Sequence, residues 1–118
     1  MADIKKIVII GTGGHSKVVL SEILQTASYK VLGFIDNFQP QGTIIDKDNN
    51  LAVLSSIENM NSVIDGDTYG IVAIGSNFLR RKIVNEIEIV SKNLRWATII
   101  SINAIVDKNA RINEGSII

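Results

Sequence analysis

The stretch IVIIGTGGHSKVV, residues 7–19, constrains the fold more than any other part of the chain. Four consecutive β-branched residues favour a buried strand, and they end at Gly11, where three glycines fall within four positions. From Ser16 onward the apolar residues recur at helical spacing, at Val19, Leu20, Ile23, Leu24 and Ala27. A strand that turns through glycines into a helix is the opening unit of a parallel α/β sheet.

The same order of strand, turn and helix recurs further along the chain. Residues 4–10, 29–36 and 96–100 predict strands, and residues 69–77 predict a strand that runs into a glycine turn. Ser76 or Asn77 is suited to cap the following helix, whose apolar stripe comprises Leu79, Ile83, Ile87, Val90 and Leu94. We therefore expect a Rossmann-like parallel sheet of about four strands with flanking helices, formed by residues 1–101.

Two shorter segments are less regular. Residues 37–55 are rich in turn formers and predict a loop with a small hairpin. Ser55 or Ser56, with Glu58 in position to complete a capping box, predicts the start of a short helix.

The candidate binding residues follow three of the expected strands. Ligands of open parallel sheets lie beyond the carboxyl ends of the strands, at the point where the strand order reverses. Three separate stretches should therefore meet in one crevice, and they supply Gly11, Gly13, Gly14, His15, Asp36, Asn37, Gly75, Ser76 and Asn77.

Each of these signals has a plainer alternative. The glycines either make a tight turn or let backbone N–H groups approach a phosphate at a helix start. His15 either packs in the loop or touches a phosphate or sugar. Asp36 stands where dinucleotide folds place an acid on a ribose hydroxyl, but it also suits a turn. The basic run Arg80, Arg81 and Lys82 is either a solvated face or turns one arginine toward a phosphate.

The end of the chain follows a different period. Small residues at positions 104, 110 and 116 are each followed two places later by Val106, Ile112 or Ile118. A period of six is typical of the hexapeptide-repeat left-handed β-helix, in which aliphatic side chains fill the coil. We expect residues 102–118 to begin such a β-helix, leaving its first coil incomplete.

Composition excludes several classes of protein. The 118 residues include 12 Lys or Arg, 12 Asp or Glu, one His and no Cys. A neutral chain gives no reason to expect a nucleic acid or an anionic membrane as partner. The absence of Cys and the single His give no metal-binding motif, so we expect no metal site. No apolar run reaches membrane-spanning length, and cytoplasmic location is the default expectation.

The motifs GTGGHSKVV, GFIDN, AIGSN followed by RRKI, and the six-residue tail resemble the N-terminal half of PglD/NeuD-type sugar acyltransferases. These bacterial enzymes acetylate amino sugars on a nucleotide diphosphate, or sialic acids. The resemblance implies that the crevice holds a nucleotide-sugar acceptor. It assigns Gly13, Gly14 and His15 to phosphates or sugar, Asp36 and Asn37 to the nucleoside, and Gly75 to the crevice floor. Asn37 stands where relatives often carry a second acid.

In the same family the catalytic histidine lies in the β-helix domain, and acetyl-CoA binds between the subunits of a homotrimer. The resemblance therefore implies that this chain is a truncated or natural fragment, with no catalytic residue and no cofactor of its own. We expect it to be inactive in acetyl transfer by itself, and to be a monomer or a weak dimer.

Two other functions remain open at this point. Asp36 and the glycine loop also suit an NAD-binding domain of a dehydrogenase or redox sensor. Against this, His15 and Ser16 stand where a dinucleotide loop needs space and a closing glycine, so we expect a UDP-linked sugar to be preferred to NAD. A ligand-sensing module without enzymatic activity is the third reading.

Overall fold

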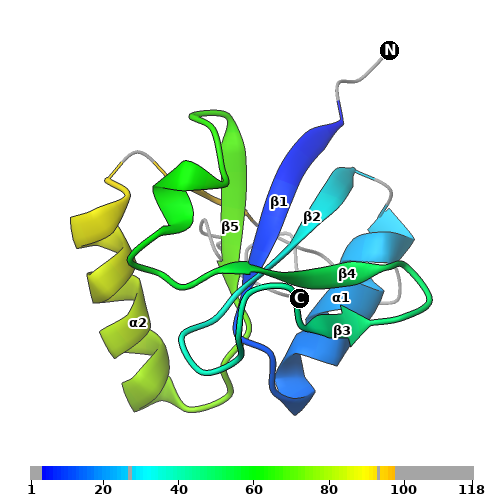
Figure 1. Ribbon diagram of the computed structural model, residues 1–118, viewed down its shortest axis with the longest axis horizontal. Coiled ribbons are helices and arrows are strands. Elements are labelled where there is room, and N and C mark those ends of the chain that lie inside the picture. The colour runs from blue at the N-terminus through cyan, green and yellow to red at the C-terminus, as the bar shows by residue number, and fades with distance from the viewer. Residues whose placement is uncertain (1–3, 27, 93, 98–118) are drawn as a thin grey trace, which may run out of the picture.

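The computed structural model describes residues 4–26, 28–92 and 94–97. A sheet of six strands lies between two helices, α1 (Gly14–Thr26) and α2 (Asn77–Val90) (Figure 1). The mixed α/β class and the mostly parallel sheet are confirmed. The remaining elements are β1 (Lys5–Ile10), β2 (Tyr29–Ile35), β3 (Ile44–Asp46), β4 (Leu51–Ser55), the 3-10 helix η1 (Met60–Ser62), β5 (Thr68–Val72) and β6 (Arg95–Trp96).

The strand order is β3-β4-β2-β1-β5-β6, and only the β3–β4 pair is antiparallel. The chain leaves β1 toward β2 on one side and later returns to β5 on the other side of β1. The order therefore reverses at β1 and β5, whose carboxyl ends lie at the lower end of the sheet in Figure 1. This is the position at which open parallel sheets bind their ligands.

The core explains why β1 is apolar throughout. Ile7 and Ile9 pack in a cluster with α1, whereas Val8 and Ile10 pack in a second cluster with α2. All four side chains are at most 1% exposed. A strand covered on both faces has no solvated side on which polar residues are favoured.

The predicted number of strands was too low. Within residues 37–55 the expected hairpin forms as β3 and β4, but β4 also joins the main sheet parallel to β2, with Phe34 opposite Val53. β4 is only five residues long and alternates buried with half-buried side chains, LAVLS, between turn-forming segments. Such a short pattern does not reveal which strand it pairs with.

The predicted capped helix at Ser55 or Ser56 was wrong. The Ser55 hydroxyl donates to the Ser56 carbonyl at 2.8 Å, and the backbone N–H of Ile57 donates to Asn37 Oδ1 at 2.9 Å. These contacts replace those of a capping box, and only the single 3-10 turn η1 follows. Glu58 lies exposed before it.

The two helices differ from expectation at their ends. α1 begins at Gly14, two residues before Ser16, and α2 ends at Val90, so Leu94 of the predicted stripe lies beyond the helix. Leu94 still packs against the α2-side core. No helix in the described part of the chain is long and apolar enough to cross a membrane.

The predicted fourth strand at 96–100 appears as β6, which starts at Arg95 and ends at Trp96 within the described residues. The Ala97 N–H extends its pairing by donating to the Gly70 carbonyl at 2.9 Å. The six-residue tail pattern and the predicted domain boundary at 101–102 lie outside the described residues.

Candidate functional site

A crevice of about 110 Å³ lies at the carboxyl ends of β1, β2 and β5, closed on one side by α2. Gly11, Asp36 and Asn37 line it, so two of the three predicted stretches meet there. From the third stretch the lining residue is Ile74, immediately before Gly75. Gly13, Gly14, His15, Gly75, Ser76 and Asn77 are exposed at the same end of the sheet, outside the lining of the cavity.

Gly11 is required by the fold. Its φ of +110° disfavours any side chain, and a Cβ at this position would lie 3.0 Å from the Ala73 carbonyl oxygen at the end of β5. Its N–H donates to the Ile35 carbonyl of β2 at 2.9 Å. Gly11 therefore lets β1, β2 and β5 come together where the chain turns, which is the tight-turn reading of this glycine.

Gly13 and Gly14 are different. A Cβ on either would meet no atom within 4 Å, and neither is among the glycines with positive φ. Packing within the described protein therefore leaves room for a side chain at both positions. Because both residues are exposed, the open space beside them faces solvent. This is the arrangement that lets a ligand approach backbone N–H groups at a helix start.

Ser16 lies on the buried side of the glycine loop. It is fully buried, its N–H donates to the Gly13 carbonyl at 3.0 Å, and its hydroxyl donates to the same oxygen at 2.5 Å. The side chain of Ser16 thus occupies room within the domain, and the expectation that His15 and Ser16 hinder a dinucleotide stays a prediction. Of the two residues invoked there, only His15 is exposed.

Asp36 and Asn37 both accept hydrogen bonds that stabilise the loop after β2. Asp36 Oδ2 accepts hydrogen bonds from the backbone N–H groups of Phe38 at 3.1 Å and Gln39 at 2.8 Å. Asn37 Oδ1 accepts from Ile57 N, which ties this loop to the segment after β4. The turn reading of Asp36 is thus correct, while its Oδ1 has no partner among the described residues and remains able to accept from a ligand.

Ser76, rather than Asn77, is the N-cap of α2. Its hydroxyl oxygen accepts from the Leu79 N–H at 3.4 Å, and its carbonyl accepts from the Arg80 N–H at 2.8 Å. Gly75 has open space around a notional Cβ, like Gly13.

The sequence analysis did not predict that side chains of α2 line one side of the crevice. Leu79, Lys82, Ile83 and Glu86 all line the crevice, and their spacing places them on one face of the helix. From the basic run it is therefore Lys82, and not one of the arginines, that lines the cavity. The spacing of Lys82 and Glu86 within the apolar stripe was the signal that pointed to them.

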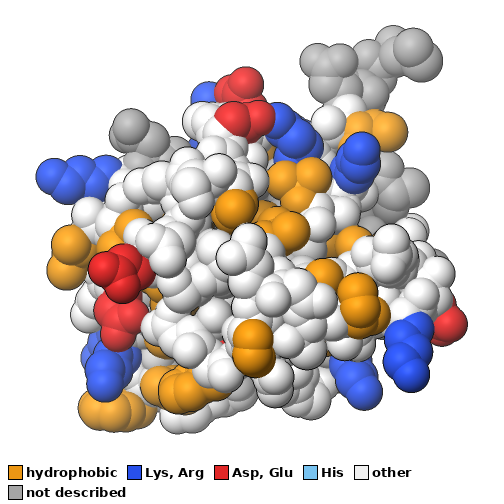
Figure 2. Space-filling view, in the orientation of Figure 1, with side chains coloured by type: hydrophobic (Ala, Val, Ile, Leu, Met, Phe, Trp, Pro, Cys, Tyr) orange, Lys and Arg blue, Asp and Glu red, His pale blue; other side chains and the backbone are white. Residues whose placement is uncertain are grey.

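Exposed apolar side chains surround this end of the molecule. Phe38, in the loop after β2, is 86% exposed and lines the crevice, and Phe78 in the first turn of α2 is 82% exposed. Figure 2 shows hydrophobic side chains at the lower left edge, over the start of α2.

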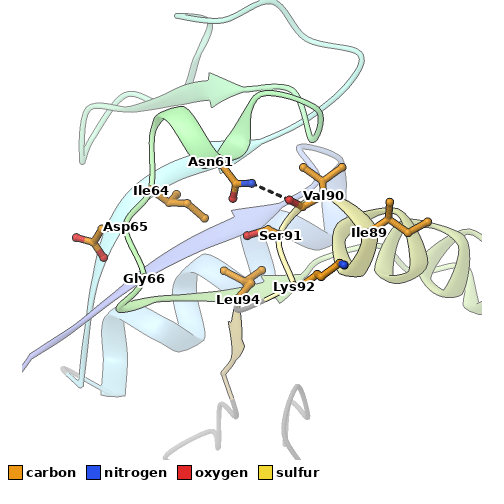
Figure 3. Close-up of a pocket in the computed structure, with 9 residues that line it drawn as sticks. All are labelled: Asn61, Ile64, Asp65, Gly66, Ile89, Val90, Ser91, Lys92 and Leu94. Carbon is orange, nitrogen blue, oxygen red and sulfur yellow. Dashed lines mark hydrogen bonds between the residues drawn. The ribbon is translucent and has the colours of Figure 1, made fainter.

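A larger hollow of about 450 Å³ lies at the other end of the sheet, between the segment after η1 and the end of α2 (Figure 3). Asn61 reaches across it and donates from Nδ2 to the Val90 carbonyl at 2.7 Å, while Asp65 points away from it and pairs with Lys6. None of the predicted binding residues lines this hollow. We therefore assign function to the smaller crevice at the point of strand reversal.

No cluster of three His, Cys, Asp or Glu side chains suited to a metal ion occurs within the described ranges. The site is thus a crevice lined by Gly11, two carboxylates, one lysine and one exposed aromatic ring. Fold and site together define an open, mostly parallel α/β domain with a crevice at its topological switch point.

Residues 6–87 match the family model described as the PglD N-terminal domain. The chain therefore belongs to this family, as the glycine-histidine loop and the motifs at Asp36 and Gly75 indicate. No curated protein matches the chain at a significant level.

Solved structures of acetyltransferases share the fold. The acetyltransferase domain of PglB from Neisseria gonorrhoeae FA1090 is 26% identical, with a TM-score of 0.76 over 96% of this chain and 52% of that one. Its complex with acetyl coenzyme A matches 98% of this chain and 53% of that one, with 26% identity and a TM-score of 0.74.

A variant of perosamine N-acetyltransferase from Caulobacter crescentus, solved with CoA and GDP-perosamine, is 24% identical, with a TM-score of 0.76 over 98% of this chain and 52% of that one. The chain spans about half the length of these structures.

Proposed function

We propose that this domain holds the nucleotide-linked sugar acceptor of a sugar acetyltransferase. The observation that carries the proposal is the crevice at the strand reversal, together with the exposed backbone of Gly13 and Gly14 at the same end of the sheet. Membership of the PglD N-terminal family and similarity to the PglB acetyltransferase domain support this acceptor-binding role.

In this proposal the diphosphate lies against the start of α1. The backbone N–H groups after Gly13, with the helix dipole, attract an anion there by about 0.3–2 kcal/mol. His15, exposed in the first turn of α1, contacts a phosphate or the sugar. The free Oδ1 of Asp36 accepts from a nucleoside hydroxyl, and Asn37 and Gly75 border the same ligand.

We assign acetyl transfer itself to the whole protein, with acetyl-CoA as donor, as in the PglB domain solved with acetyl coenzyme A. An amine or hydroxyl of the sugar attacks the thioester carbonyl, a base removes its proton, and CoA leaves as the thiol. The residues described here bind and orient the acceptor and supply no step of the chemistry.

Calorimetric titration with UDP, a UDP-amino sugar, a GDP-linked sugar and NAD tests the proposal. We expect a nucleotide sugar to bind more tightly than NAD. Gly13→Val should weaken binding because its side chain fills the open space at the phosphate path. Gly66→Val is the matched control, since Gly66 also has no neighbour within 4 Å of a notional Cβ but lies at the opposite end of the sheet.

Asp36 needs two variants because it serves the loop as well. Asp36→Asn keeps an oxygen for the N–H groups of Phe38 and Gln39, whereas Asp36→Ala removes it. We expect Asp36→Asn to weaken nucleoside binding with little loss of stability. Tighter binding of NAD than of every nucleotide sugar, or equal binding by wild type and Gly13→Val, would contradict the proposal.

A further inference from the structure

The side chain of Phe38 is largely exposed to solvent, so packing within the domain does not account for an aromatic residue at this position. It is 86% exposed and yet forms part of the crevice lining. A phenyl ring in water forgoes the favourable burial that aromatic side chains normally gain. A ring at the edge of a ligand crevice is instead available to a flat apolar partner.

Hydrogen bonds of the loop fix the backbone that carries this ring. Asp36 Oδ2 accepts from the Phe38 N–H itself and from the next N–H along the chain, which closes a turn around the residue. Asn37, the neighbour on the other side, is tied to Ile57. Ile57 is 3% exposed and lines the same crevice, so the loop is anchored to the core beside the cavity.

The opposite wall carries hydrogen-bonding groups. Lys82 and Glu86 lie one turn apart on α2, and both line the crevice. Neither has an ion-pair or hydrogen-bond partner through its side chain among the described residues. A flat ligand against Phe38 would therefore present its polar edge to one donor and one acceptor that the protein leaves unused.

We propose that Phe38 is the platform on which the nucleobase stacks, and that Glu86 recognises a ring N–H on the edge of that base. The inference rests on the proposed function, because it assigns the nucleoside end of the same ligand. Stacking is tolerant of base identity, since every base has a π face. Selectivity must therefore come from the edge.

The chemistry of Glu86 favours one class of base. A carboxylate only accepts hydrogen bonds. Uracil, thymine and guanine carry a ring N–H beside a carbonyl on their pairing edge, whereas adenine and cytosine present a ring nitrogen lone pair there. Glu86 accepts from that N–H, and Lys82 donates to the adjacent carbonyl. Bases of the first class should bind more tightly than adenine or cytosine.

The test compares UDP, GDP, CDP and ADP on the whole chain by calorimetry and by NMR of the base protons. Phe38→Leu should weaken all binding by roughly 5- to 150-fold, the range expected for one lost stacking contact. Phe38→Trp should retain affinity. Phe78→Leu is the matched control, since Phe78 is 82% exposed but lies outside the crevice lining.

The base protons provide a readout that general loss of affinity does not mimic. On binding to wild type they should shift upfield in the ring current of Phe38, and at saturation with Phe38→Leu this shift should be absent. Glu86→Gln should reduce the preference for UDP and GDP over CDP and ADP.

Different outcomes would contradict the stacking inference and the proposed function. Wild-type affinity for a nucleotide sugar with unchanged binding and proton shifts in Phe38→Leu would overturn the stacking inference and leave the proposed function intact. An unchanged base preference in Glu86→Gln would overturn the edge-reading role. A wild-type chain that binds none of these nucleotides would overturn the proposed function, and the inference with it.

Discussion

Glycines 11 and 13 stand two residues apart in one loop and meet opposite demands. Gly11 adopts a positive φ and approaches the Ala73 carbonyl, whereas Gly13 has an ordinary φ and open surroundings. The fold requires a glycine at position 11. Packing leaves room for a side chain at position 13, so ligand binding is the better explanation for the glycine there.

Gly11→Ala should therefore lower the free energy of unfolding by about 1–3 kcal/mol, the usual cost of forcing a side chain into such a backbone conformation. The added Cβ would also press on the Ala73 carbonyl oxygen at 3.0 Å. Urea unfolding followed by circular dichroism measures the loss. Gly13→Ala serves as the control and should change stability by less than about 0.5 kcal/mol; equal losses for the two variants would refute this distinction.

Among the elements, α2 connects the crevice to the far end of the sheet. Ser76 caps its start beside the candidate site, and Asn61 donates to the Val90 carbonyl at its end, 2.7 Å away. Carbonyls in the last turn of a helix lack partners within the helix, so this bond satisfies one of them. It also attaches the segment after β4 to α2.

Asn61→Ala should destabilise the chain by about 1 kcal/mol, because one hydrogen bond to a helix end is lost. Amide hydrogen exchange should increase most in the last turn of α2 and in η1. Asn59→Ala is a suitable control, since the Asn59 side chain donates only to the Ser56 hydroxyl at 3.4 Å. Unchanged exchange at the end of α2 in Asn61→Ala would show that the bond contributes nothing there.

At the scale of the whole molecule, the end of the sheet opposite the crevice is held by an ion pair. Lys6 at the start of β1 pairs with Asp65 in the turn before β5. The Lys6 ammonium, followed by the N–H of Asp67 and the hydroxyl of Thr68, lowers the pKa of Asp65 below its ordinary value of 3.8. The contact joins β1 to the turn before the neighbouring strand β5, at the end of the sheet opposite the candidate binding residues.

This pKa implies a pH dependence of stability. Because the folded pKa is the lower one, the stabilisation is present above the unfolded value of 3.8 and is lost as pH falls through the folded pKa. Urea midpoints of wild type and Asp65→Asn should therefore differ at pH 6 and converge toward pH 2. Nucleotide affinity should be the same in both chains. A difference in midpoint that does not shrink in acid would rule out this ion pair as its cause.

The local patterns of the sequence were sufficient to predict β1, α1, β2, β5 and α2. In each, a β-branched run or an apolar stripe of helical period extends over enough residues to stand out, and glycines or Ser76 mark the turns. The α/β class and the meeting of Gly11 and Asp36 at one edge also follow from the sequence, because parallel strands share the direction of their carboxyl ends.

Only the tertiary structure decided which strands pair and which groups form hydrogen bonds with one another. The sequence does not show that β4 pairs with β2, or that Asn37 accepts from Ile57 and displaces the expected capping box, since each donor has several acceptors within reach along the chain. It also does not show that Phe38 and Glu86 line one cavity, because they lie on different elements. Periodicity is encoded by neighbours along the chain, whereas strand order, hydrogen-bond partners and the walls of a crevice depend on residues that only folding brings together.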